Sequence, residues 1–97
     1  MFRIKVSEFA LLDFEEAYYW YEEQRKGLGD DLGLCFDEGL EIISRHPYFE
    51  EREKEIRILN IRRFPYQIIY RITGEMIEVV AFFHGHRNPR VWQTRIE

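Results

Sequence analysis

The densest group of side chains that could take part in chemistry lies near the end of the chain, between residues 83 and 95. It holds two histidines, three arginines and a tryptophan: His84, His86, Arg87, Arg90, Trp92 and Arg95. Imidazole titrates near neutral pH and can act as a general acid or base, and arginine makes planar bidentate contacts with phosphate or carboxylate. Asn88 followed by Pro89 is typical of a helix start, where unpaired N–H groups favour an anion. We therefore expect this segment to hold a phosphate or a partner's carboxylate.

The two histidines are two residues apart, so their side chains lie on the same side if the strand continues through them. A metal site would need a third ligand, and the sequence offers no convincing one. The single Cys35 leaves no cysteine-based zinc site and no intramolecular disulfide, and we expect no metal and no cofactor. His84 or His86 could transfer protons instead, but a structural hydrogen bond at a strand end is the interpretation that we favour.

Four further arginines lie on the strands predicted before this segment: Arg57, Arg62, Arg63 and Arg71. RNA cleavage by the 2′-hydroxyl needs a cation over the developing phosphorane charge as well as an acid and a base. Arg63 or Arg87 could supply that cation. The alternative is that the arginines pair with the chain's own acids, which we favour for Arg71 with a cross-strand glutamate at position 55, 75 or 78.

Charge is distributed unevenly along the chain, whose net charge is −4. The first half, residues 1–49, is acidic, whereas all seven cations of residues 56–97 are arginines, set against three glutamates. An acidic body with an arginine-rich half predicts one continuous basic recognition surface that another macromolecule occupies. A partner segment that binds this surface should carry Asp or Glu together with apolar anchors.

Hydrophobic spacing indicates the elements that position these residues. Apolar residues alternate over 2–6, as in a half-buried strand. Ser7 can cap a helix that runs to about Lys26, and Asp30 or Asp31 can open a second helix that ends near His46, before Pro47. The short glycine-containing break between these helices predicts an antiparallel helical hairpin.

The second half of the chain is predicted to be mainly strand. The charged stretch 50–55 is expected to be a loop, and strands are expected at about 56–62, 66–72 and 76–83. A short helix follows near residue 89. The order β-α-α-β-β-β predicts an α+β fold of two layers, an antiparallel sheet packed on a helical hairpin, as one domain over residues 1–97. The other face of the sheet is expected to have less cover.

Several aromatic residues could either pack or bind. Trp92 could stack on a base or insert into a partner's groove, although packing against the body is slightly favoured. The run of four aromatic residues at 18–21 cannot all face inward on one helix, so at least one ring should contact the second helix or a partner. Core filling is the better interpretation for that run.

No apolar stretch approaches the roughly 20 residues that span a bilayer, and we expect a cytoplasmic protein without a membrane contact.

Two stretches of the sequence have an order and a spacing that are together characteristic of one protein superfamily. The first is EEAYYWYEEQ at 15–24, followed by GLG at 27–29. The second is RRFPYQIIY at 62–70, followed by a strand, HGHRNP at 84–89, and then Trp92 and Arg95. Nearly the whole chain in this way resembles the RelE/ParE superfamily of toxins from bacterial type II toxin–antitoxin systems, and more closely its ParE branch.

This resemblance implies a fold in which a sheet carries a helical hairpin, and an antitoxin that wraps the toxin with a flexible segment. The pair would repress its own operon, with operator DNA bound only through the antitoxin. RelE-like members cleave messenger RNA in the ribosome, whereas ParE-like members inhibit DNA gyrase and have no recognised nuclease centre. RelE-like toxins carry an arginine followed six residues later by a tyrosine, where this chain has His86 and Trp92. That departure and the scarcity of lysine count against ribosome binding.

Three hypotheses follow from the resemblance. The first is a ParE-like toxin that binds gyrase through Arg87, Trp92 and Arg95. The second is a ribosome-dependent endoribonuclease, which would draw on four residues: Arg63, His84, His86 and Arg87. The third is an inactive module that only binds the antitoxin.

Overall fold

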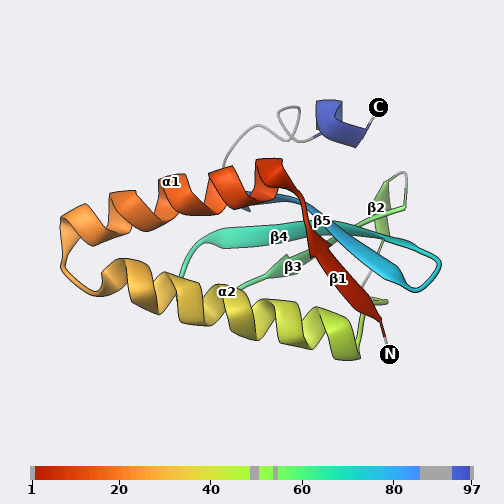
Figure 1. Cartoon of the computed structure of the whole chain (residues 1–97), viewed down its shortest axis with the longest axis horizontal. Coiled ribbons are helices and arrows are strands. Elements are labelled where there is room, and N and C mark those ends of the chain that lie inside the picture. The colour runs from red at the N-terminus through yellow and green to blue at the C-terminus, as the bar shows by residue number, and fades with distance from the viewer. Residues whose placement is uncertain (1, 49–50, 54, 86–92, 97) are drawn as a thin grey trace.

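The computed structural model describes residues 2–48, 51–53, 55–85 and 93–96, and the side chains of all of these except 51–53 and 96. Two helices pack side by side against one face of a sheet, and the turn at the end of the chain lies beside the start of α1 (Figure 1). The α+β class and the helical hairpin predicted from the sequence are confirmed.

The first helix, α1 (Glu8–Gln24), begins where the capping pattern predicts. The Ser7 Oγ accepts a hydrogen bond of 3.1 Å from the Ala10 backbone N–H, which satisfies one of the N–H groups left unpaired at a helix start. Ala10 and Ala17 are buried against the sheet. Their small side chains let the backbone of α1 approach the strands closely.

The second helix, α2 (Leu28–Arg45), begins two residues before the first predicted cap, Asp30. The cause is a cap supplied by the preceding helix. The Glu22 carboxylate accepts hydrogen bonds of 2.9 Å from the backbone N–H groups of both Gly27 and Gly29. Gly27 turns the chain with a φ of 90°, a conformation that a glycine adopts without steric cost.

Five strands form the sheet: β1 (Arg3–Val6), β2 (Glu51–Glu53), β3 (Ile56–Asn60), β4 (Tyr66–Thr73) and β5 (Met76–His84). Their order across the sheet is β1-β5-β4-β3-β2. The pairs from β2 to β5 are antiparallel, but β1 is parallel to β5, with Arg3 opposite Met76 and Val6 opposite Val79.

The sheet therefore differs from the sequence prediction in two ways. It is mixed rather than antiparallel, because alternation in a short strand shows which face is buried but not the direction of its neighbour. The stretch 50–55, predicted to be a loop, contains the short strand β2 at the edge of the sheet. Charged residues are typical of edge strands, since they discourage pairing with a further chain.

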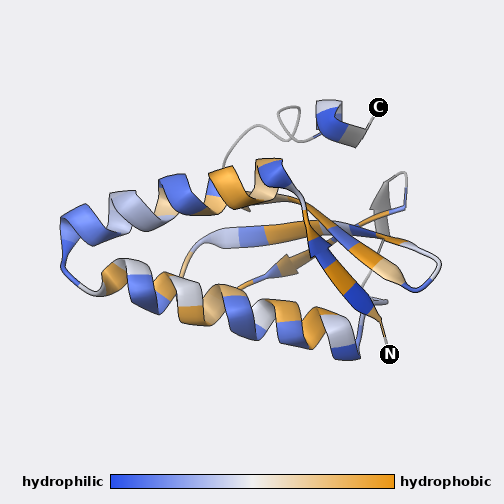
Figure 2. Cartoon of the chain, viewed as in Figure 1, coloured by the Kyte–Doolittle hydropathy of each residue, from blue (hydrophilic) through white to orange (hydrophobic). Residues whose placement is uncertain are grey.

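Both faces of the sheet carry buried apolar residues. On the helix side, Ile68, Tyr70, Ile77 and Phe82 pack with Phe36 and the rest of the main core. The opposite face, which the sequence suggested would have less cover, carries a second cluster that is also buried: Ile56, Ile69, Val80, Ala81 and Phe83. In Figure 2 the strands accordingly carry long hydrophobic stretches, whereas the end of α1 next to the interhelical turn is largely hydrophilic.

A β-bulge interrupts the pairing of β4 with β5. Ile69 lies opposite Ala81, whereas the next residue, Tyr70, lies opposite Val79, so Val80 has no partner of its own across the ladder. A bulge of this kind re-aims the local backbone. Here it coincides with the point where β1 stops pairing with β5.

The end of the described chain is a short 3-10 turn, Thr94–Ile96. The helix start predicted at Asn88 and Pro89 lies outside the described residues. Within the part of the chain that the structure describes, no helix combines the length and the apolar character needed to cross a membrane.

Candidate functional site

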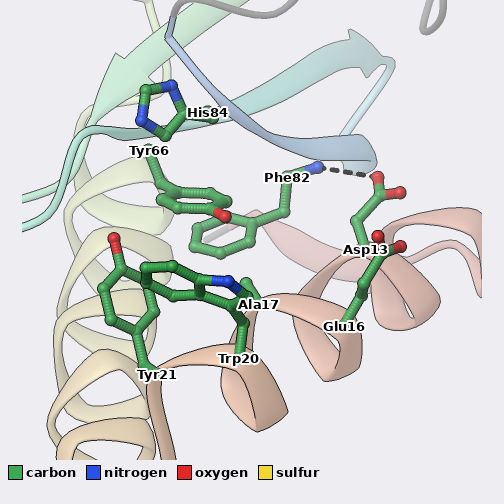
Figure 3. Close-up of a pocket in the computed structure, with 8 residues that line it drawn as sticks. All are labelled: Asp13, Glu16, Ala17, Trp20, Tyr21, Tyr66, Phe82 and His84. Atoms are coloured by element: carbon green, nitrogen blue, oxygen red, sulfur yellow. Dashed lines mark hydrogen bonds between the residues drawn. The ribbon is translucent and has the colours of Figure 1, made fainter. Parts of the chain in front are cut away.

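A groove lies between α1 and the second half of β5, and we call it the α1–β5 groove. Strand β1 pairs with β5 only as far as Val79, so beyond that point the neighbour of β5 on this side is helix α1. The groove has a volume of about 330 Å³ and is lined by eight residues: Asp13, Glu16, Ala17, Trp20, Tyr21, Tyr66, Phe82 and His84 (Figure 3). It is the environment in which His84 lies.

Aromatic rings form most of its walls. The rings of Tyr66 and Phe82 are stacked with their centroids 4.8 Å apart, and the His84 ring meets Tyr66 edge-on at 5.4 Å. On the helix side, the half-exposed indole of Trp20 meets the ring of Tyr21 edge-on at 5.0 Å. Figure 3 shows the indole on one side and the Tyr66–Phe82 pair on the other.

The aromatic run at 18–21 divides between the core and the surface, as its length requires. Tyr21 packs against Phe64 in the core, and burial raises its pKa. Tyr18 donates a hydrogen bond of 2.9 Å to Asp30 at the start of α2, and this bond raises the pKa of Tyr18. Tyr19 and Trp20 remain more than half exposed. The expected contact with the second helix is therefore made by Tyr18.

Asp13, which lines the groove, belongs to an ion pair that we call the Arg95 clasp. The Arg95 guanidinium donates to both oxygens of the Asp13 carboxylate, at 2.7 and 3.1 Å, and to the Val80 carbonyl at 3.0 Å. The same carboxylate accepts a hydrogen bond of 3.1 Å from the Phe82 N–H. Only 14% of the Arg95 side chain and 12% of the Asp13 side chain are exposed.

Two rings flank the clasp. The Arg95 guanidinium lies 5.1 Å from the ring centroid of Phe9 and 5.0 Å from that of Phe83, distances at which a cation is attracted to an aromatic face. Arg95, which was predicted to contact a target, thus joins the end of the chain to α1 and to the bulge in β5. In this structure its role is internal.

The other described arginines of the second half of the chain also contact residues of their own chain. Arg71 pairs with Glu78 at 2.8 Å, which confirms the cross-strand pairing favoured from the sequence. Arg62 and Arg63 make longer ion pairs of 3.4 Å, with Glu38 and Asp31 of α2. The guanidinium of Arg57 lies 5.4 Å from the ring centroid of Tyr48.

These arginines do not share one face. Arg57 lies opposite Tyr70 in the β3–β4 ladder, and Arg71 is the next residue along β4. Successive side chains of a strand point to opposite faces, so Arg57 and Arg71 are on different sides of the sheet. The single open basic surface expected from the charge distribution is therefore not formed by the arginines that the structure describes.

The residues proposed for a nuclease are only partly described. His84 lies in the α1–β5 groove, whereas Arg63 contacts Asp31 and does not line that groove. His86, Arg87 and Trp92 lie outside the described residues. Among the described residues, no group of three His, Cys, Asp or Glu side chains could hold a metal ion.

The chemistry of the groove suits a cationic or apolar group better than a phosphate. Of its two carboxylates, Asp13 is already paired with Arg95, whereas Glu16 has no ion pair with a described residue and would repel an anion. Asp13 and Glu16 were not among the candidate site residues predicted from the sequence. The signal was available in the spacing: positions 13, 16 and 20 form one stripe of a helix, directly beside the core stripe.

Comparison with known proteins agrees with this architecture. The family model described as "ParE toxin of type II toxin-antitoxin system, parDE" matches residues 4–89. Two curated relatives named Toxin ParE2, from Mycobacterium tuberculosis strains CDC 1551 / Oshkosh and H37Rv, are each 30% identical over 96 residues. Each alignment covers 97% of this chain and 91% of the relative.

A solved structure titled "Chromosomal ParDE TA system from P. aeruginosa" has the same fold. It superposes with a TM-score of 0.78 at 17% identity, covering 87% of this chain and 96% of the other. The resemblance seen in the sequence to the RelE/ParE superfamily, and to its ParE branch, is thereby confirmed. The chain belongs to the ParE family of toxins of type II toxin–antitoxin systems.

Proposed function

We propose that this protein is a toxin that inhibits DNA gyrase by binding it in the cytoplasm, and that a cognate antitoxin neutralises it. We favour gyrase over messenger RNA as the target because of the environment of His84. The described lining of the groove around this histidine holds the carboxylates of Asp13 and Glu16 and no arginine, and Arg95, which contacts Asp13, is already paired with it. The described residues thus offer a scissile phosphate there no free cation for its transition state.

In this proposal Arg87 and Trp92 contact the target, and Arg95 holds their segment on the body of the protein. The segment is anchored on both sides by described contacts. At its start, the Gly85 N–H donates a hydrogen bond of 2.8 Å to the Pro65 carbonyl, and at its end the Arg95 clasp binds α1 and β5. No cofactor is needed, and operator DNA is bound only through the antitoxin.

The test is to add the purified protein to a gyrase supercoiling assay and, in parallel, to a translating ribosome extract. We expect supercoiling to be inhibited and translation to continue. Trp92→Ala should weaken the inhibition at least about tenfold, the usual effect of losing a central aromatic contact. Tyr48→Ala is the control, because Tyr48 is an exposed aromatic residue that is not among the proposed target contacts. Cleaved messages would identify an endoribonuclease instead, and no effect in either assay would identify an inactive antitoxin-binding module.

A further inference from the structure

We propose that the α1–β5 groove binds the cationic side chain of an arginine or lysine that an extended segment of the antitoxin carries. This inference rests on the proposed function, since it concerns how that antitoxin is recognised. It assigns to the partner a charge opposite to the one expected from the arginine-rich half of the sequence.

The first support is the combination of aromatic faces in the groove. A cation is attracted to the face of an aromatic ring within about 6 Å of its centroid, and most strongly to tryptophan. The groove places the half-exposed indole of Trp20 on one side and the stacked rings of Tyr66 and Phe82 on the other (Figure 3). Its volume of about 330 Å³ is at the lower end of the roughly 300–1,000 Å³ of ligand pockets. It therefore suits one long side chain.

The second support is charge. The Asp13 carboxylate is engaged by Arg95 and by the Phe82 N–H, whereas the exposed Glu16 makes no ion pair with a described residue. Glu23 lies exposed on the same helix. An incoming cation would thus meet a negative helix and one carboxylate within the groove, which favours both its approach and its pairing.

The third support is a precedent within the molecule. Next to the groove, the Arg95 guanidinium is held by the Asp13 carboxylate between the rings of Phe9 and Phe83. The groove repeats this combination of a carboxylate and aromatic rings about one helical turn further along α1, with Glu16 and Trp20. The same chemistry that holds an arginine of this chain can hold an arginine or lysine of another.

The position of the α1–β5 groove suits a partner segment in extended conformation. The groove runs beside β5 where β1 has stopped pairing with it. An extended segment of the antitoxin can place one long side chain into the groove without pairing as a strand, because the Phe82 N–H and the Val80 carbonyl of this part of β5 are already bonded by Asp13 and Arg95. Nucleic acid does not fit, because its phosphates would face the carboxylate of Glu16, which pairs with no described cation.

The direct test uses nuclear magnetic resonance of the ¹⁵N-labelled full chain with N-acetyl-arginine amide as the probe and N-acetyl-citrulline amide as its neutral counterpart. We expect the arginine probe to shift the Trp20 indole signal and the backbone signals of Glu16 and Phe82, with at least about tenfold weaker binding of citrulline. Glu16→Gln and Trp20→Ala should each weaken the binding of the arginine probe at least about fivefold. Glu15→Gln and Tyr19→Ala should leave it unchanged.

These controls are matched, because Glu15 and Tyr19 are the exposed neighbours of the two groove residues on the same helix. Equal binding of citrulline and arginine would overturn the proposal. The proposal would also be overturned if replacing Arg87 or Arg90 shifted the groove signals, because the chain would then fill its own groove. Groove signals that shift with protein concentration alone would likewise overturn it in favour of a second copy of the chain.

The second arm measures the affinity of the cognate antitoxin for the same four variants. We expect Trp20→Ala and Glu16→Gln to weaken antitoxin binding while Tyr19→Ala and Glu15→Gln do not. Unchanged affinity for all four would overturn the assignment of the groove to the antitoxin. Failure of the proposed function would give a different result. The unmodified protein would then not inhibit gyrase supercoiling, whatever the groove binds.

Discussion

Arg95 and Asp13 are 82 residues apart in sequence and form an ion pair that little solvent reaches. Charges removed from water are costly unless they are paired and hydrogen-bonded. Here the carboxylate receives three hydrogen bonds, two from the guanidinium and one from the Phe82 N–H. The guanidinium in turn satisfies the Val80 carbonyl at the β-bulge. One arginine therefore stabilises α1, β5 and the end of the chain together.

Replacing Arg95 with alanine should lower the free energy of unfolding by roughly 2–4 kcal/mol, because Asp13 would keep its charge in a mostly buried position without a partner cation. Urea denaturation at neutral pH measures this loss. Arg62→Ala is the matched control: its pair with Glu38 is 3.4 Å long, and 74% of the arginine side chain is exposed. Removing that pair should cost less than about 1 kcal/mol. Equal losses from the two variants would mean that the clasp is open in solution.

At the scale of elements, the helices were largely predictable because their apolar residues recur at helical spacing over many turns. The start of α2 was not, because its cap comes from Glu22 in the preceding helix and not from a residue next to the first turn. The parallel pairing of β1 and the short strand β2 were also missed. Both depend on neighbours distant in sequence, which local periodicity does not encode.

The site was predictable only in part for the same reason. His84 could be singled out from its residue type and its place at a strand end. Its surroundings could not, because Tyr66 and Trp20 reach it from two other elements. Arg95 illustrates the same limit. Its residue type allowed a target's anion or one of the chain's own acids, and only the fold shows that its partner is Asp13.

The interhelical cap gives a prediction at this scale. Glu22→Ala should lower the free energy of unfolding by about 1 kcal/mol or more, because two backbone N–H groups at the start of α2 would lose their acceptor. Thermal unfolding followed by circular dichroism measures the change. Glu23→Ala provides the comparison, since Glu23 is exposed and no hydrogen bond or ion pair joins it to a described residue. A loss of stability as large in Glu23→Ala as in Glu22→Ala would argue against the cap.

At the scale of the whole molecule, the sheet contributes residues to two hydrophobic clusters, one on each face. Strands β4 and β5 lie in the middle of the sheet, and both of their faces are buried over much of their length. The helical hairpin covers one face, and the second cluster lies on the other. This arrangement explains why three successive residues of β4, Ile68, Ile69 and Tyr70, are all fully buried. Such a run departs from the alternation expected for a sheet with one solvated face.

Two adjacent isoleucines of β4 test this arrangement. Ile68 belongs to the main core and Ile69 to the second-face cluster, and neither is exposed to solvent. Ile68→Ala and Ile69→Ala should each lower the free energy of unfolding by roughly 2–5 kcal/mol, because both leave a cavity in packed surroundings. Urea denaturation of the two variants compares the faces directly, since residue type, strand and burial are matched. If Ile69→Ala cost less than about 1 kcal/mol while Ile68→Ala cost several, Ile69 would not be packed in solution and the second cluster would not form a core.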